Sequence, residues 1–413
     1  MYRCVTKITI NQRPSADWPN RNTVLNLDFA NSYESSSSWR DLTNKGKFVI
    51  PKNLYFRDQF GKLRPLRGTN VNVGGFSSNA PLLLRGDKVK IESGYKYVDK
   101  AGRQVTDTAT WFEGYVSKVG SKIPIECELE DNMWSLKQTP MDNVTYSGST
   151  SVETILQAMV NKCNAIFGTA FTVNMTSQTI VGNSINTGGL QAAQVLIELQ
   201  KKYGFESYFR GNELRSGVLV YLPSDNLKAD GTPITPNVFA FQQNIISDEL
   251  QYQRKDDITL SAKASNCITE ETGGTTKDGR AKTRKVRLEV LVTLKHNPGP
   301  GEVPYVYRVI NKGEVIAQTD EGERREFHFP SAMTTAELAS MAYEKLRMYL
   351  YTGFKGKFTT FGIPFVQQGD NIVIKDPILP ERNGTYRVRS VGYSGGVNGL
   401  RQEIELDFKL NVT

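Results

Sequence analysis

Four acidic residues that lie close together are the first candidates for catalysis. Glu126, Glu128, Glu130 and Asp131 all fall within a short segment of the chain. Two carboxylates about 5–9.5 Å apart, one of them in an apolar pocket, can hydrolyse a glycosidic bond. The three glutamates alternate, however, and would share one face of a strand, which predicts a solvated strand edge or the wall of a barrel lumen. A protein that binds or cleaves glycans is therefore kept as the alternative function.

Other residue types that support catalysis are few or unfavourably spaced. The chain has two histidines, His296 and His328, which excludes most histidine-based triads and imidazole metal sites. Zinc-site cysteine spacing and the common nucleotide-binding and hydrolase motifs do not occur in the sequence. The cysteines are predicted to be buried free thiols: Cys4, Cys127, Cys163 and Cys267. We predict a protein that is not an enzyme, with no catalytic residue, no metal site and no cofactor.

The charge balance gives little support to nucleic-acid binding. The chain has 51 Lys and Arg residues and 43 Asp and Glu residues, a formal net charge of +8. The basic residues concentrate at 277–287, inside a polar stretch that predicts a long exposed hairpin or a flexible loop. This stretch lacks the interleaved aromatic residues on which bases stack. A nucleic-acid-binding protein is therefore the less favoured alternative.

The elements that must position these residues are mostly strands. Short runs of alternating apolar and polar residues, typical of antiparallel sheets, fill the first 145 residues and resume at Phe239. Between these regions, a capping box at Thr150–Glu153 and a second apolar stripe after Gly188–Gly189 predict two helices. Another capping box, Thr334–Glu337, predicts a helix near 334–352. The fold class is thus mainly β with an inserted α+β unit.

The length and the change in composition predict the domain organisation. At about 150 residues per domain, the chain of 413 residues has two to four domains. We predict three, which cover residues 1–146, 147–235 and 236–413. No apolar stretch approaches the roughly 18 residues of a membrane span, and the N-terminus lacks the pattern of a signal peptide. No membrane segment is expected.

An ordered set of short motifs occurs twice. Each copy has a Gly-Asp turn, a strand, a hairpin strand and a last strand, in that order. The marker residues are Gly86, Asp87, Gly114 and Tyr115 in the first copy and Gly369, Asp370, Gly384 and Tyr386 in the second. An aspartate at such a turn bonds to nearby backbone groups, whereas a phosphate cradle would need a following helix. We therefore predict structural roles for these residues.

The duplication also predicts a register. The two copies should superimpose with Val89 on Ile372, Ile91 on Ile374, Tyr115 on Tyr386 and Glu126 on Glu405. A slip of one residue would exchange the inward and outward faces of a strand. The correspondence is therefore a strict prediction.

Several stretches resemble one known family. They are Ser37–Thr43 with Phe48–Pro51, Leu84–Ile91, Phe112–Val116, Ile125–Lys137 with Trp134 inside it, Phe361–Asp370, and Gly384–Val388. Of these, Ile125–Lys137 is the most specific. Together they resemble the baseplate hub proteins of phage tails, the late control gene D family, which is similar to the hub part of type VI secretion spike proteins.

This resemblance implies an architecture and a set of partners. It implies two tail-tube-like antiparallel β-barrels per chain and a homotrimer whose six similar barrels form a ring. Such a trimer would join the sixfold tail tube, or a distal tail protein, to the threefold spike. It would act in viral genome ejection, with transient contact to genomic DNA in the lumen. Its expected place is the tail tip or baseplate of a virion assembled in the host cytoplasm.

Overall fold

The computed structural model describes most of the chain. The described residues are 2–19, 21–51, 55–57, 60–65, 81–122, 124–146, 150–175, 185–203, 205–217, 221, 223–228, 230–255, 259–275, 281–295, 298–299, 301–311, 314, 323–329 and 334–410. Strands dominate, and the prediction of a mainly β chain is confirmed. No helix among these residues is both long enough and apolar enough to cross a membrane.

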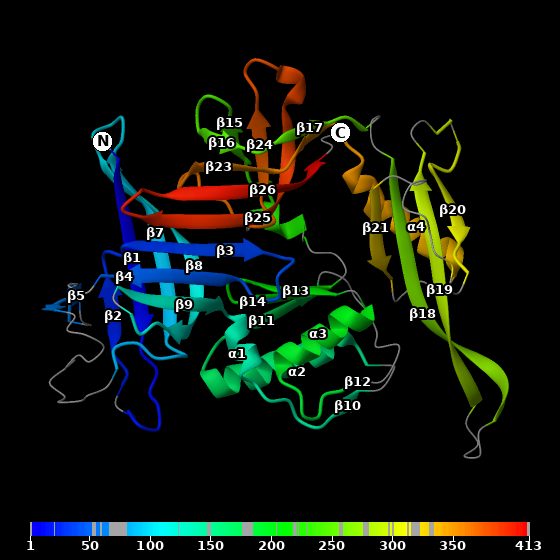
Figure 1. The fold of residues 1–413 in the computed structure, drawn as a ribbon, viewed down its shortest axis with the longest axis horizontal. Coiled ribbons are helices and arrows are strands. Elements are labelled where there is room, and N and C mark those ends of the chain that lie inside the picture. Colours follow the sequence, from blue (N-terminus) through cyan, green and yellow to red (C-terminus); the bar gives the residue numbers. More distant parts are fainter. Residues whose placement is uncertain are drawn as a thin grey trace.

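One large sheet contains strands from both ends of the chain (Figure 1). From the N-terminal part come β1 Arg3–Asn11, β2 Val24–Leu27, β3 Ser32–Ser38, β4 Lys45–Ile50, β5 Tyr55–Arg57, β6 Leu63–Pro65, β7 Lys88–Val98, β8 Gln104–Val119 and β9 Ile125–Asp131. From the C-terminal part come β15 Asn237–Ala240, β16 Ile245–Asp248, β23 Lys357–Phe361, β24 Asn371–Lys375, β25 Gly384–Gly396 and β26 Arg401–Leu410. Below, these two sets are called the first and second halves of the main sheet.

The strand order joins the halves into one path. It runs β16-β23-β26-β25-β3-β4-β9-β8-β7-β1-β2-β5-β6, with β24 on β25 and β15 on β24. The prediction of two β-barrels per chain is not confirmed, because the described strands form no closed barrel. Instead, β3 pairs with β25, so the edge of the first half continues into the second half. One apolar core, which includes Phe48, Val89, Ile372 and Ile404, spans both halves.

An α+β unit lies beside the main sheet. It contains α1 Met133–Lys137, α2 Val152–Phe167, α3 Ala192–Tyr203, the three-stranded sheet of β11 Thr172–Met175, β14 Glu213–Gly217 and β13 Glu206–Arg210, and the pair β10 Thr145–Tyr146 with β12 Ile185–Asn186. The two predicted helices are confirmed. The predicted capping box at Thr150–Glu153 is wrong, because Ser151 is the N-cap and accepts a hydrogen bond from the backbone N–H of Glu153.

A second, smaller sheet covers one side of a helix. Its order is β20-β19-β18-β21, with β18 Leu260–Thr275, β19 Ala281–Leu294, β20 Tyr305–Val309 and β21 Glu323–His328. Helix α4, Thr335–Leu346, packs on it and begins with the predicted capping box of Thr334 and Glu337. Strands β18 and β19 form the predicted long hairpin, while its tip at 276–280 lies outside the described residues. The remaining elements are β17 Gln251–Gln253 paired with β22 Gly353–Lys355, and the short helices η1 Pro223–Asn226, η3 Arg347–Tyr349 and η4 Pro380–Arg382.

Candidate functional site

The two Gly-Asp turns are built in the same way. The N–H of Gly86 donates to the carbonyl of Val116 at 2.8 Å, and the N–H of Val116 donates back to the carbonyl of the turn aspartate at 2.9 Å. In the second half, the N–H of Gly369 donates to the carbonyl of Val388 and the N–H of Val388 donates back to the aspartate, both at 2.9 Å. Val116 therefore corresponds to Val388.

The strands after the turns follow this correspondence. Val89 lies opposite Gly114 and Ile372 lies opposite Tyr386, so Val89 corresponds to Ile372 as predicted. The same pairing confirms Ile91 on Ile374.

The predicted superposition of Tyr115 on Tyr386 is wrong by one residue. Tyr115 precedes Val116 directly, whereas Tyr386 stands two residues before Val388, so the residue that corresponds to Tyr115 is Arg387. The two tyrosines consequently face opposite sides of the sheet. Tyr115 stacks on Trp134 with ring centroids 4.9 Å apart. Tyr386 is buried in the main core, where its hydroxyl accepts a hydrogen bond from the N–H of Phe354 at 2.9 Å.

A β-bulge repeats at the same place in both halves. The pairing of β8 with β9 shifts between Val116 and Lys118, and the pairing of β25 with β26 shifts between Val388 and Ser390. Bulges bend a strand and raise its twist. The two hairpin strands therefore share a local distortion as well as a register.

Beyond the bulge, a second predicted match is corrected. Lys118 lies opposite Glu128, and Ser390 lies opposite Glu405. Glu405 therefore corresponds to Glu128, and Glu126 corresponds to Glu403. The predicted match of Glu126 with Glu405 is wrong by two residues, which keeps the face of the strand but moves the position along it.

Each half carries the same trio of charges on its outer face. Lys47 contacts Glu34 at 3.7 Å and Glu126 at 3.4 Å, and Lys357 contacts Glu249 at 3.7 Å and Glu403 at 3.2 Å. The hydrogen bond from Glu126 raises the pKa of Lys47, and that from Glu403 raises the pKa of Lys357. The two trios occupy corresponding positions, because each lysine lies opposite one member of the pair Glu128 and Glu405.

The candidate catalytic carboxylates are engaged in other contacts. Glu128 pairs with Lys118 and Glu130 with Lys137, at 3.0 and 2.9 Å. Asp131 is buried, and its two oxygens accept the N–H groups of Asn44 and Met133, each at 3.1 Å. Burial raises the pKa of Asp131 to about 7. No cluster of three acidic, histidine or cysteine side chains suited to a metal occurs among the described residues.

The first turn aspartate holds a buried cation. Asp87 is fully buried, and both of its oxygens pair with the guanidinium of Arg21. It also accepts the N–H groups of Arg13 at 2.9 Å and Leu84 at 2.8 Å. The carboxylate thus ties Arg13 and Arg21 to the turn.

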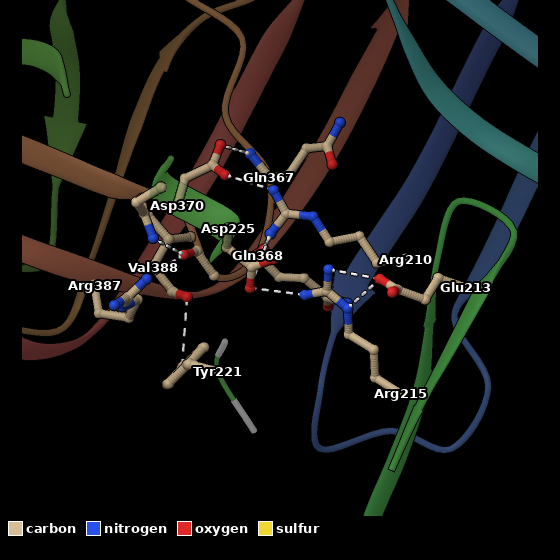
Figure 2. A network of polar contacts seen from close by, with 12 residues as sticks. Arg210, Glu213, Arg215, Tyr221, Asp225, Gln367, Gln368, Asp370, Arg387 and Val388 are labelled. Carbon is tan, nitrogen blue, oxygen red and sulfur yellow. Dashed lines mark hydrogen bonds and ion pairs between the residues drawn. The ribbon is translucent and has the colours of Figure 1, made fainter. Parts of the chain in front are cut away.

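The second turn aspartate binds the α+β unit instead (Figure 2). Asp370 pairs with Arg210 of β13 at 2.9 Å and accepts the N–H of Gln367 at 2.8 Å. Burial raises the pKa of Asp370, and the nearby Arg210 opposes this effect. Arg210 also donates to the carbonyl of Gln368 at 2.8 Å. One arginine therefore attaches the α+β unit to the second half.

Further polar contacts extend this attachment, and sequence analysis missed them. Asp225 pairs with Arg215 at 2.7 Å and lies 3.7 Å from Arg210. Tyr221 accepts a hydrogen bond from the indole of Trp39 at 2.8 Å and donates to Asp407. Of this network, the sequence predicted a hairpin turn at Arg210 and nothing more. Charged residues that pair across long stretches of chain leave no local sequence pattern.

Two of the sequence-predicted glycines permit close packing. Gly86 has a φ of +92°, and a Cβ there would lie 2.9 Å from the ring of Trp134. A Cβ on Gly114 would lie 2.1 Å from the carbonyl oxygen of Glu130. Gly384 begins β25 and lies opposite Ile374. The structure therefore brings Gly86, Tyr115 and Trp134 together. The second copy's residues lie on or beside β24 and β25, and β3, β4 and β9 separate β25 from β8 in the sheet.

The halves meet at the junction of β3 with β25. Ser32–Ser38 pair antiparallel with Ser390–Gly396. Val391 and Tyr393, whose side chains face the core at this junction, are 0% and 3% exposed.

A cavity of about 310 Å³ lies where both halves and the α+β unit meet. Its lining includes Trp111, Asn132, Phe365, Gln368 and Tyr393. Four buried polar atoms of this lining have no hydrogen-bond partner in the described part of the chain: the indole nitrogen of Trp111, the amide oxygen of Asn132 and both amide atoms of Gln368.

The other sequence alternatives fall partly outside the described residues. His296 is not described, and neither are the side chains of 277–285, which carry most of the basic stretch. Most of the segment predicted as a nucleic-acid site therefore lies outside the described residues.

Comparison with known proteins indicates the fold. No family model matches the chain, and no curated protein matches it. The tail protein from Neisseria meningitidis MC58 is similar to it, with a TM-score of 0.50 and 11% identity over 98% of this chain and 97% of that one.

Two further solved structures are similar over the whole chain. The 43 kDa tail protein of prophage MuSo2 from Shewanella oneidensis has a TM-score of 0.48 and 12% identity, over 97% of this chain and 98% of that one. A chain of the lidded Francisella PdpA-VgrG complex has a TM-score of 0.49 and 10% identity, over 100% of this chain and 53% of that one. At these identities the likeness concerns the fold alone. The likeness to the Neisseria meningitidis MC58 protein shows that the chain has the fold of a tail protein, and the resemblance to the hub proteins of phage tails is confirmed at that level.

Proposed function

We propose that the protein is a structural hub of a phage tail or of a related injection machine. One observation carries this proposal: a single chain contains two half-sheets with the same turn, register, bulge and charge trio, joined edge to edge. Three such chains would present six similar units to a sixfold tube. The proposed assembly is a homotrimeric adaptor between the tail tube and a threefold spike.

The parts that occur once per chain suit the threefold side. The α+β unit and the sheet of β18 to β21 with α4 have no counterpart in the other half among the described residues. A trimer would therefore carry three copies of each. In this proposal they provide the threefold contacts, while the paired half-sheets provide the sixfold ones.

The remaining expectations from the sequence belong to this proposal. The division at 1–146, 147–235 and 236–413, the location at the tail tip of a virion and the transient contact with genomic DNA are parts of it. The sequence-selected residues act in it as turn and packing positions, with no catalysis. They are Gly86, Asp87, Gly114, Tyr115, Trp134, Gly369, Asp370, Gly384 and Tyr386.

A deletion experiment tests the proposed function. Particles produced without this chain should lack the link between tail tube and spike, and the full chain supplied in trans should restore it. Electron microscopy of the particles and their protein composition are the readouts. Particles that assemble and inject normally without the chain would overturn the proposal.

The cavity favours one second candidate, binding of a small neutral polyol such as a monosaccharide. A hydroxyl both donates and accepts, so it can satisfy the unpaired donors of Trp111 and Gln368 and the unpaired acceptors of Asn132 and Gln368. Aromatic side chains of Phe365 and Tyr393 also line the space. Ordered water satisfies the same atoms, and the test must separate the two.

NMR titration with glucose or N-acetylglucosamine makes this separation. If a sugar binds, the indole N–H resonance of Trp111 shifts at millimolar sugar, Gln368→Met abolishes the shift, and the exposed-site control Gln243→Met retains it. An unchanged Trp111 resonance would mean that the cavity holds water only.

A further inference from the structure

A second cavity lies between the first half of the main sheet and the α+β unit. Its volume is about 400 Å³, and cavities of about 300–1,000 Å³ hold small ligands. On the side of the sheet it is lined by Lys88 of β7 and Tyr115 of β8. On the side of the α+β unit it is lined by Phe167, the last residue of α2, and by Phe171 of the following loop. Residues 11–14, at the end of β1, also line it.

The charges at this cavity do not balance. Among the described lining residues, Arg13 and Lys88 are the charged ones, and none is acidic. Lys88 is paired with Glu113 at 2.7 Å. Arg13 makes no ion pair with a described residue. The cavity therefore has one positive charge without a counter-charge in the described part of the chain.

The side chain of Arg13 is held at the cavity. Its guanidinium lies over the ring of Phe167, 4.6 Å from the centroid, which is a favourable cation–π contact. Phe167 ends α2, and the negative end of the helix dipole also favours a cation there. None of the five N–H donors of this guanidinium has an acceptor among the described residues. They are available to a ligand with two acceptor oxygens.

Tyr115 provides a further donor. The residue is only 5% exposed, and no described residue forms a hydrogen bond with its hydroxyl. Burial raises the pKa of Tyr115 to about 12, so the hydroxyl keeps its proton at neutral pH. Buried polar groups normally have a hydrogen-bond partner. The hydroxyl can therefore donate to an oxygen that enters the cavity.

The wall formed by the α+β unit is preorganised. The amide oxygen of Asn164 accepts the hydroxyl of Thr169 at 2.8 Å and the N–H of Phe171 at 2.9 Å, and its amide nitrogen donates to the carbonyl of Phe171 at 2.9 Å. The N–H of Thr172 donates to the carbonyl of Asn212, another lining residue, at 3.1 Å. A wall that is already ordered loses little conformational freedom when a ligand binds.

The arginine beside the second turn shows what such a charge binds. Arg210 pairs with Asp370 at 2.9 Å and lies 3.7 Å from Asp225. Two carboxylates of the chain thus neutralise it, whereas Arg13, beside the first turn, lacks a carboxylate partner among the described residues.

We propose that this cavity binds a carboxylate carried on a small aromatic or apolar body. The carboxylate pairs with Arg13 and accepts the hydroxyl of Tyr115, while the body packs against Phe167 and Phe171. The site goes beyond the proposed hub function and does not depend on a trimer. Two sources share this chemistry: a free small acid and a glutamate side chain of another protein.

NMR titration of the full chain with phenylacetate tests the proposal, and phenylacetamide is the neutral control of the same shape. The backbone amide resonances of Gly86 and Gly168, which line the cavity, should shift with phenylacetate and stay in place with phenylacetamide. Equal shifts with both compounds would overturn the proposal, because the cavity would then bind the ring without reading the charge.

A peptide distinguishes the two sources. An acetylated tripeptide amide with glutamate between two phenylalanines carries the carboxylate on a side chain. Tighter binding of this peptide than of phenylacetate would identify a protein segment as the ligand, and the opposite order would identify a free acid. If neither compound shifts the Gly86 and Gly168 resonances, no carboxylate site exists here.

Two variants test the named donors. Arg13→Gln should weaken phenylacetate binding by about tenfold or more, because it removes a hydrogen bond between two charged groups. Tyr115→Phe should also weaken it, and Arg3→Gln, an exposed arginine of β1 outside the cavity, is the matched control that should not. Arg13→Gln keeps the backbone N–H that donates to Asp87, so its urea midpoint should match that of the unaltered protein. Unchanged affinity in Arg13→Gln would overturn the assignment.

Discussion

At the scale of single residues, the two turn aspartates differ although their turns match. Asp87 and Arg21 are both buried and pair through two oxygens, whereas Asp370 and Arg210 remain partly exposed. Removing one partner of a buried ion pair leaves an uncompensated charge. The sequence predicted both turns, because a Gly-Asp turn is local. It did not predict that Arg21 and Arg210 pair with the turn aspartates, because both arginines come from distant segments.

We therefore expect unequal losses from the two alanine variants. Asp87→Ala should lower the free energy of unfolding by about 3–5 kcal/mol, because the buried Arg21 loses its carboxylate partner. Asp370→Ala should cost about 1 kcal/mol, mainly from the turn. Urea unfolding measures both. Equal losses would show that the buried pair adds nothing to the turn.

The buried Asp131 predicts a pH dependence. Burial raises its pKa from the usual 3.8 to about 7, so the folded state holds this proton more tightly than the unfolded state does. The free energy of unfolding should therefore fall as pH rises from about 4 to about 7. Asp131→Asn should remove this part of the slope in unfolding experiments across that range. If the free energy of unfolding of Asp131→Asn kept the pH slope of the unaltered protein, the raised pKa of Asp131 would be contradicted.

At the scale of elements, sequence patterns predicted the strands but not their full register. The sequence match aligned one tyrosine with another, yet the valines that close the two turns, Val116 and Val388, determine the true alignment. The shared β-bulge moved the glutamate match by two residues. A bulge adds a residue to one strand without any composition signal, so alternation alone cannot locate it.

The corrected register predicts different roles for Tyr115 and Tyr386. Tyr386→Phe leaves the buried N–H of Phe354 without its acceptor and should cost about 1–3 kcal/mol. Tyr115→Phe keeps the stacking on Trp134 and should cost less than about 0.5 kcal/mol. Thermal and urea unfolding of the two variants provide the comparison. A larger loss of stability for Tyr115→Phe than for Tyr386→Phe would support the original superposition of Tyr115 on Tyr386.

At the scale of the whole molecule, composition and the repeated motifs predicted a mainly β chain with an α+β insertion and a duplication. They did not predict that both halves merge into one open sheet through β3 and β25. The pairing joins residues near the two ends of the chain, and its serine-rich strand lacks an apolar pattern that would identify a partner. This polar strand joins the two halves within one chain.

The symmetry of the assembled particle tests whether this chain is a trimeric hub. Electron cryomicroscopy of the isolated tail or spike complex should show three copies of this chain, with six half-sheets at equivalent places around one axis. A particle with a copy number that is not a multiple of three, or with the two half-sheets at unrelated radii, would show that the chain is not a trimeric hub.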